Sequence, residues 1–149
     1  MWYRVFCRTS NEVKPDEIIA HLHTWSVVGR FRGDDLGWTG AELIVGKGTP
    51  IYADRYLTSE DSLREDLNTW AAYLETLDYS NRRFELMEHV IQTQQLVTIR
   101  KPLDHANEVV IEDVCRSLCQ VIAASSEGIY QIENEGWYSA SGECLLKEY

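Results

Sequence analysis

The sequence lacks a hydrophobic run long enough to cross a membrane. No apolar stretch approaches the ~18 residues of a membrane-spanning helix, because Asp, Glu, Lys or Arg interrupts every hydrophobic segment. The first residues also lack the apolar core of a secretory signal, since Arg4 and Arg8 fall within them. We therefore expect a cytoplasmic protein that has no membrane partner.

Positively charged residues are scarce. The 149 residues include 14 Lys and Arg against 24 Asp and Glu, which gives a formal net charge of −10. This sign is wrong for neutralising the phosphates of nucleic acid. We expect no nucleic-acid partner, and an acidic chain is better suited to a basic protein or a small cationic ligand.

Motifs that carry catalysis or hold a cofactor are missing as well. Residues 46–49 lack the spacing of a phosphate-binding loop, and residues 139–142 lack the Gly-x-Ser-x-Gly pattern of an exposed nucleophile. His21 and His23 are two residues apart, so on a helix they point in different directions and cannot easily share a metal ion. We expect no cofactor and no bound metal, and the sequence names no catalytic residue.

The cysteines form neither a metal site nor a disulfide framework. Cys115 and Cys119 are four residues apart on a predicted helix, but no nearby Cys or His completes a set of four ligands. A chain of 149 residues needs no disulfides to fold. We expect reduced thiols at Cys7, Cys115, Cys119 and Cys144.

Hydrophobic residues make up 44% of the chain and charged residues 26%, the balance of an ordinary globular domain. Alternation predicts strands over 2–8, 27–32, 42–45, 50–57, 96–100, 129–132 and 143–146. Helical spacing predicts helices over 14–24, 58–78 and 107–125, and one from Ser80 or Asn81 with Phe84, Met87, Val90 and Ile91 on one face. Thr58 and Asp61 resemble a capping box at the start of the second helix. The expected core contains Val5, Val28, Ile44, Leu67, Trp70, Val114, Leu118 and Leu145.

Two segments near the ends of the chain resemble each other. Phe31–Trp38 and Tyr130–Trp137 each run from an aromatic residue through six others to a Trp, at an offset of 137 − 38 = 99 residues. Turn chemistry alone could also produce the shared Gly and Trp. We expect a single domain over 1–149, with pseudo-repeat halves at about 1–57 and 95–149 joined by a helical segment over 58–94.

Both ends read β-α-β-β, which predicts an α+β fold. The expected architecture is a two-layer sandwich, either ferredoxin-like or a tandem β-α-β-β repeat, with a mostly antiparallel sheet and helices on one face.

Carboxylates precede the Gly-Trp pair in both segments. If the repeat is real, the two hairpins could meet at one edge of the sheet and form a negative rim beside two Trp rings. Such a rim could hold a cationic ligand, a basic protein surface or a hard cation. The alternative is that the carboxylates are solvated turn residues and the rings cover the sheet. The candidate binding residues are Asp34, Asp35, Trp38, Glu133, Glu135 and Trp137.

Two classes of function fit these observations. The first is a non-catalytic binding or interaction module, which engages a basic protein as an antitoxin-like or immunity-type inhibitor does, or forms a homodimer by joining sheet edges. The alternative is a small enzyme that uses the hairpin carboxylates with His89 or His105 as acid–base groups, with or without a metal ion.

Overall fold

The structure, a computed structural model, describes residues 1–105 and 107–149. Its helices are α1 (Pro15–His21), the short 3-10 helix η1 (His23–Trp25), α2 (Arg64–Glu75), α3 (Arg83–Ile91) and α4 (Glu108–Ser125). Its strands are β1 (Trp2–Cys7), β2 (Val28–Asp34), β3 (Gly37–Ile44), β4 (Ile51–Leu57), β5 (Gln95–Arg100), β6 (Gly128–Ile132), β7 (Gly136–Ser139) and β8 (Cys144–Lys147). No helix in this described part of the chain is long and apolar enough to cross a membrane.

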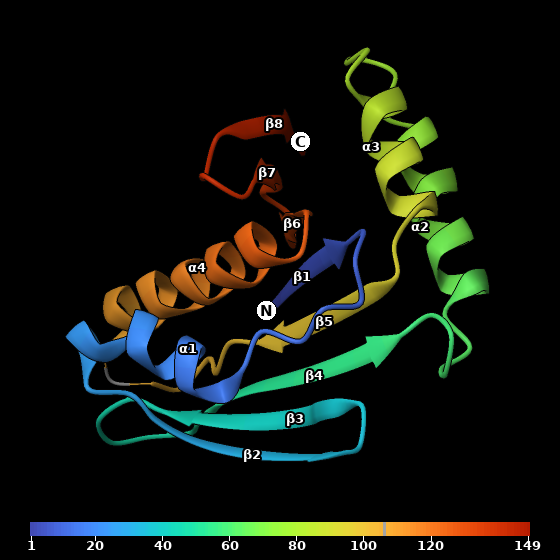
Figure 1. The fold of residues 1–149 in the computed structure, drawn as a ribbon. Coiled ribbons are helices and arrows are strands. Elements are labelled where there is room, and N and C mark those ends of the chain that lie inside the picture. Colours follow the sequence, from blue (N-terminus) through green and yellow to red (C-terminus); the bar gives the residue numbers. More distant parts are fainter. Residues whose placement is uncertain (106) are drawn as a thin grey trace.

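The eight strands form one sheet in the order β2-β3-β4-β5-β1-β6-β7-β8. Every neighbouring pair is antiparallel. The first strand of the chain therefore lies in the middle of the sheet, between β5 and β6 (Figure 1). The predicted α+β class with an antiparallel sheet is confirmed.

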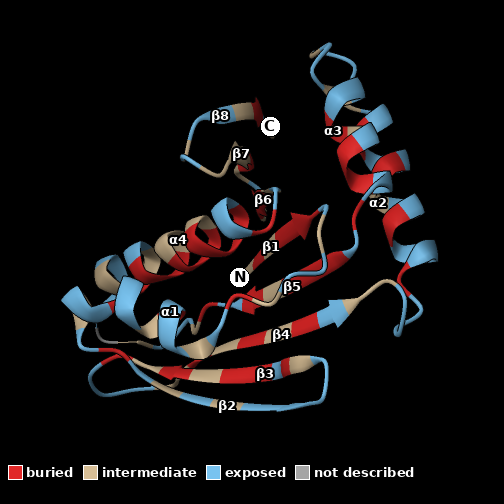
Figure 2. Ribbon diagram, in the orientation of Figure 1, coloured by how far each residue is buried: buried red, intermediate tan, exposed pale blue. Residues whose placement is uncertain are grey.

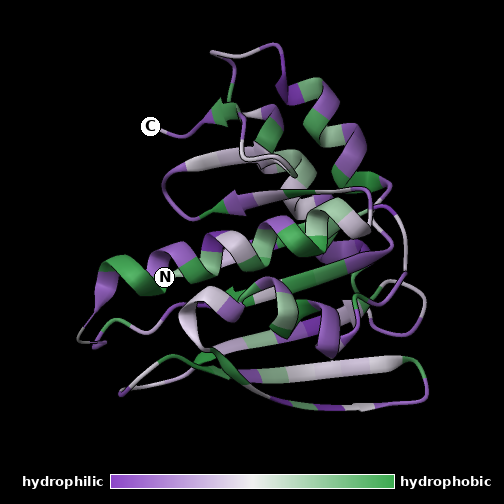
Figure 3. Cartoon of the chain, turned by 60° about the vertical axis from the view of Figure 1, so that its left-hand side comes forward, coloured by the Kyte–Doolittle hydropathy of each residue, from purple (hydrophilic) through white to green (hydrophobic). Residues whose placement is uncertain are grey.

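Helices α1 and α4 cover one side of the sheet, which we call the first face (Figure 1). Val114 and Leu118 of α4 share a hydrophobic cluster with Val5 of β1 and Val97 of β5. The Asn107 side chain accepts a hydrogen bond from the Val110 amide and so caps α4, as its position predicts. In Figure 3 the long helix carries both hydrophobic and hydrophilic patches, as an amphipathic helix on a sheet requires.

Helices α2 and α3 cover part of the opposite side, the second face. Leu67 of α2 and Val90 of α3 form a separate cluster with Phe6 and Leu96. Phe6 and Leu96 directly neighbour Val5 and Val97 in their strands, so they point to the other face. The prediction of two layers with helices on one face is therefore wrong, because β1 and β5 are apolar on both faces where the helices cover them.

The rest of the second face has no helix over it. Arg32, Gly40, Asp54 and Thr98 are successive cross-strand neighbours there, and the side chains of Arg32, Asp54 and Thr98 are not buried. Figure 2 shows the same change from buried central strands to the mostly exposed edge strand β2. The polar half of this face is therefore accessible to a partner.

Four predicted core residues are not buried. Trp70 is half-buried and packs against the second-face cluster. Val28 is 58% exposed because it lies on the edge strand β2. Ile44 and Leu145 are only half-buried, whereas their direct neighbours Leu43 and Leu146 are buried. Where two apolar residues are adjacent, the sequence pattern does not decide which of them faces the helices.

Three local predictions also differ from the structure. Helix α2 begins at Arg64, since the Thr58 hydroxyl donates to the Thr93 carbonyl at 2.9 Å instead of capping a helix. On α3, Phe84 and Ile91 are exposed rather than turned to the core. The predicted C-terminal hairpin has a third strand, β7, between β6 and β8.

The strand order does not follow a simple duplication. The first three-strand meander joins the centre through β4, which pairs with β5. The second joins through its first strand, β6, which pairs with β1. The ferredoxin-like and tandem-repeat descriptions therefore stay predictions, while the α+β class stands.

Candidate binding site

The β2–β3 hairpin carries the first two predicted carboxylates at its tip. Asp34 Oδ1 accepts a hydrogen bond from the Leu36 amide at 2.9 Å, which fixes the turn. Gly37 follows with φ of 109°, a conformation that favours glycine. Asp34 and Asp35 are both exposed, so this tip remains accessible to a ligand.

Trp38 lines a pocket of about 500 Å³ with Asp34 and Asp35, but most of its side chain is buried. A bulge next to the Arg32–Gly40 pair changes the register of the hairpin, and Trp38 lies in the first-face cluster with only 4% of its surface exposed. Its indole Nε1 donates to the Val13 carbonyl at 3.0 Å, and its amide donates to Glu12 Oε2 at 2.5 Å. Trp38 therefore anchors the hairpin to the segment before α1.

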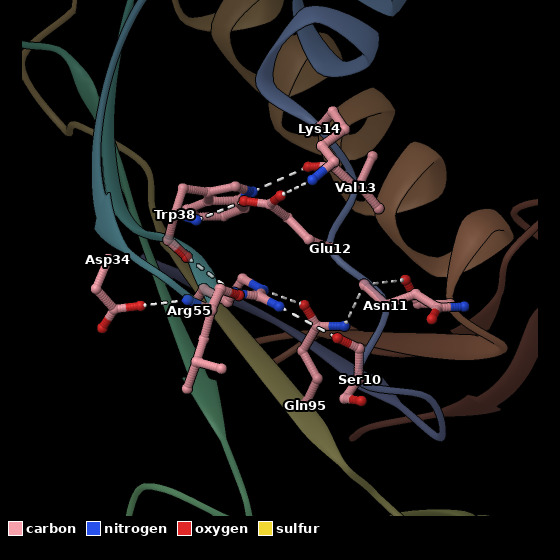
Figure 4. A network of polar contacts seen from close by, with 11 residues as sticks. Ser10, Asn11, Glu12, Val13, Lys14, Asp34, Trp38, Arg55 and Gln95 are labelled. Atoms are coloured by element: carbon pink, nitrogen blue, oxygen red, sulfur yellow. Dashed lines mark hydrogen bonds and ion pairs between the residues drawn. The ribbon is translucent and has the colours of Figure 1, made fainter.

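Arg55 holds the same hairpin from β4 (Figure 4). Its side chain is 4% exposed, and Nη1 donates to the carbonyls of Leu36 and Trp38, both at 3.1 Å. Nη2 donates to the Ser10 carbonyl at 3.2 Å, and Nε donates to Gln95 Oε1. One guanidinium thus ties the hairpin to β5 and to the segment that follows β1.

The carboxylate of Glu12 affects the charge of Arg55. Burial lowers the pKa of Arg55, and the charge of Glu12 partly offsets this effect. Burial alone would raise the pKa of Glu12, but hydrogen bonds from Lys14 at 2.7 Å and from the Trp38 amide outweigh it and lower that pKa. Glu12 therefore stays ionised and helps to keep Arg55 charged.

A pocket of about 340 Å³ opens between this hairpin, β4 and the β4–α2 loop, and we call it the acidic pocket. Two cations also line it, but Arg55 already donates to backbone carbonyls, and Arg32 Nη2 lies 3.4 Å from Asp54 Oδ1. Four carboxylates line it, those of Asp34, Asp54, Glu60 and Asp61. The pocket therefore carries an excess of negative charge.

Two apolar side chains lie among these carboxylates. Leu36 is 50% exposed and Tyr56 is 37% exposed, and both line the acidic pocket. Burial raises the pKa of Tyr56, and the nearby Asp54 and Asp61 raise it further, so its phenol stays neutral at pH 7. Carboxylates around an exposed aromatic ring suit the alkyl chain and charged head of Lys or Arg.

The second predicted hairpin is built differently. Both oxygens of Glu135 lie 2.7 Å from Arg116 Nη2, and Tyr138 donates to Oε2 at 2.5 Å. Burial alone would raise the pKa of Glu135, but these two partners outweigh it and lower the pKa. The Glu135 charge is therefore already paired within the protein.

The two other predicted residues of this hairpin also make internal contacts. Trp137 is fully buried and stacks on Phe6, with ring centroids 5.3 Å apart. Glu133 Oε2 accepts a hydrogen bond from the Trp2 amide at 3.1 Å. The Trp137 ring therefore covers the second face of the sheet. This agrees with the alternative interpretation of the sequence, in which the Trp rings cover the sheet and bind no ligand.

The two hairpins do not meet. Four antiparallel steps separate β2 from β1, so both strands run in the same direction, whereas β6 runs against β1. The β2–β3 turn therefore lies at the end of the sheet where β1 finishes, and the β6–β7 turn lies where β1 begins. The expected shared rim is not formed, although ligand binding at either hairpin stays a prediction.

Of the four carboxylates in the acidic pocket, only Asp34 was a predicted site residue. Asp54 and Tyr56 lie on a predicted strand at alternate positions, which place both on one face. Glu60 and Asp61 lie in a loop that was predicted to be the first turn of a helix. The alternation in β4 could have indicated a polar, partly aromatic sheet face, but only the fold brings that face beside the β2–β3 turn.

His89 and His105 contact backbone carbonyls, and the cysteines, all among the described residues, form no disulfide. His89 Nε2 lies 2.8 Å from the Phe6 carbonyl, and His105 Nε2 lies 2.8 Å from the Val45 carbonyl. All four thiols are free, and three of them are buried while Cys144 is exposed. Within residues 1–105 and 107–149, no group of three or more His, Cys, Asp or Glu is placed to hold a metal ion.

Comparison with known proteins finds no match for this chain: neither a protein-family model, nor a curated protein, nor a solved structure is significantly similar to it. Its function is therefore inferred from the geometry of the site.

Proposed function

We propose that this protein is a non-catalytic binding protein that holds a basic polypeptide partner. One Lys or Arg of the partner enters the acidic pocket, where its alkyl chain contacts Leu36 and Tyr56 and its charge meets the surrounding carboxylates. The observation that carries this proposal is that two separate loops and one strand bring four carboxylates around two exposed apolar side chains.

The electrostatics of the whole chain support the same partner. The net charge of −10 attracts a basic polypeptide and raises its rate of encounter. Anchoring of the hairpin by Arg55 and Trp38 keeps the tip in place before the partner arrives, which lowers the entropic cost of binding.

Fluorescence anisotropy of labelled hexalysine tests this proposal. The wild type should bind the peptide, and the affinity should fall as salt rises, because the screening length at ~0.15 M is only about 8 Å. A double variant, Asp34→Asn with Glu60→Gln, removes two carboxylates of the acidic pocket and should weaken binding about fivefold or more.

The matched control is Glu75→Gln with Glu85→Gln, which removes the same formal charge from exposed positions on α2 and α3. This control should bind hexalysine nearly as tightly as the wild type. Equal weakening in both double variants would overturn the proposal, because hexalysine would then respond only to net charge.

A further inference from the structure

A second pocket lies at the other end of the second face and shares no lining residue with the acidic pocket. Its volume is about 340 Å³. Helix α2 contributes Trp70 and Tyr73, β1 contributes Arg4, and β6 contributes Gln131. Three further lining residues, Glu133, Asn134 and Glu148, come from the turn after β6 and from the segment after β8.

Arg4 is held in place in this pocket but is not neutralised by direct contact. Its guanidinium lies 4.7 Å from the centre of the Trp70 ring, and Nη1 donates to Gln131 Oε1 at 3.2 Å. Gln131 is itself buried and donates to Glu148 Oε1 at 3.0 Å. Among the described residues no carboxylate lies within 4.0 Å of Arg4. Four of the five N–H groups of this guanidinium therefore have no hydrogen-bond partner in the described chain.

Two carboxylates face the same cavity. Glu133 and Glu148 lie beyond ion-pair distance from Arg4, yet their charge partly offsets the lowering of the Arg4 pKa by burial. Glu133 uses one oxygen to accept from the Trp2 amide. Tyr73 and Glu148 both line the pocket, and burial and the charge of Glu148 raise the pKa of the Tyr73 phenol. The pocket thus keeps a positive and a negative group apart.

An aromatic wall completes the pocket. The Trp70 ring meets Tyr73 edge-on, with centroids 5.7 Å apart, and it meets Trp137 at 5.9 Å. These contacts fix the Trp70 ring, so an apolar group that enters the cavity finds a rigid surface.

From this arrangement we infer that the second pocket binds a free α-amino acid. The carboxylate of the ligand pairs with the guanidinium of Arg4, its ammonium lies toward Glu133 and Glu148, and its side chain contacts Trp70 and Tyr73. The two signs of charge also explain selectivity. A ligand with only a carboxylate leaves the two glutamates without a positive partner, and a ligand with only an ammonium leaves the Arg4 guanidinium without a negative partner.

Thermal denaturation in the presence of each protein amino acid at millimolar concentration tests this inference. At least one amino acid should raise the melting temperature, because a ligand that binds only the folded state stabilises it. If no amino acid raises it, the inference is wrong, and the proposal for the acidic pocket is unaffected.

Calorimetric titration then separates a zwitterion site from a simple charged site. The amino acid that gives the largest shift is compared with its decarboxylated amine and with the corresponding acid that lacks the amino group. The amino acid should bind about tenfold or more tightly than either analogue. Equal binding of an analogue would overturn the inference.

Two substitutions assign the groups within the pocket. In Arg4→Gln the amino acid should no longer bind more tightly than its decarboxylated amine. In Glu133→Gln the amino acid should lose part of its higher affinity over the acid that lacks the amino group, while the glutamine still offers an oxygen to the Trp2 amide. Arg30→Gln changes an exposed arginine outside the pocket and should leave both advantages unchanged. Loss of amino-acid binding in Arg30→Gln as well would contradict the assignment.

Discussion

At the scale of single residues, Asp34 has two separable roles. Its carboxylate accepts the Leu36 amide within the turn, and it also lines the acidic pocket. An asparagine keeps the oxygen that the turn needs but loses the charge that the pocket uses. The two roles can therefore be tested apart.

We predict that Asp34→Asn with Asp35→Asn leaves the melting temperature nearly unchanged and weakens hexalysine binding. Exposed turn carboxylates contribute little to folding, with surface ion pairs worth about 0 to 1 kcal/mol. Asp34→Ala should instead lower the free energy of unfolding by about 1 kcal/mol, because the Leu36 amide loses its partner. Urea unfolding and fluorescence anisotropy measure the two effects, and a large loss of stability in the Asn variant would show that charge is needed for the turn.

His89 should make stability depend on pH. Burial lowers its pKa below 6.5, and the nearby Arg8 lowers it further, while the Phe6 carbonyl and Glu127 act in the opposite direction. Because the folded pKa is lower than the unfolded one, the unfolded state binds more protons between the two values. The stability contribution is therefore present above about pH 6.5 and is lost as pH falls below that value.

Urea unfolding between pH 8 and pH 5.5 measures this dependence. The variant His89→Gln keeps a donor for the Phe6 carbonyl but does not titrate, so its stability should change less over this range. An identical pH dependence in both proteins would assign the effect to other groups.

At the scale of elements, Arg55 determines how β4 holds the β2–β3 hairpin. We predict that Arg55→Lys lowers the free energy of unfolding by about 2 to 4 kcal/mol, because a lysine cannot reach the acceptors on both sides and leaves buried carbonyls unpaired. Amide hydrogen exchange should also become faster over residues 36–38. Arg32→Lys, at an exposed position, should change stability by only about 0.5 kcal/mol. A fully stable Arg55→Lys protein would show that Trp38 alone anchors the hairpin.

The elements themselves could be predicted from the sequence more easily than their details. Alternation in residues 2–8 and helical spacing in 107–125 predicted β1 and α4 because both elements bury long, regular apolar patterns. The strand β7 was missed because four residues between two turns carry too short a pattern. Thr58 resembled a helix cap, yet its hydroxyl bonds to the distant Thr93 carbonyl, a contact that only tertiary structure creates.

At the scale of the whole molecule, the position of each hairpin depends on the order of the strands. Local patterns contain no information on whether β4 or β2 pairs with β5, so the sequence could not show that the two acidic hairpins lie at opposite ends. The sequence indicated Asp34 as a binding residue of an acidic hairpin, and the structure places it in the acidic pocket. The sequence could not identify Asp54, which joins the pocket only through pairing between β3 and β4.

Burial throughout the molecule should make three thiols unreactive. Burial raises the pKa of Cys7 and of Cys115 to about 12 and raises that of Cys119 as well, whereas Cys144 is exposed. We predict that a thiol reagent titrates one thiol quickly in the native protein and four after denaturation without reductant. Fewer than four reactive thiols after denaturation would indicate a disulfide. Rapid reaction of more than one thiol in the native protein would contradict the burial of Cys7, Cys115 and Cys119.

Under the proposed function, the acidic pocket rather than net charge recognises the basic polypeptide. Titration of ¹⁵N-labelled protein with hexalysine, followed by amide chemical shifts, tests it most directly. The shifts should concentrate in residues 34–39 and 54–61, the two segments that contain most residues of the acidic pocket. Shifts spread evenly over the acidic surface, or concentrated around residues 133–137, would contradict the claim.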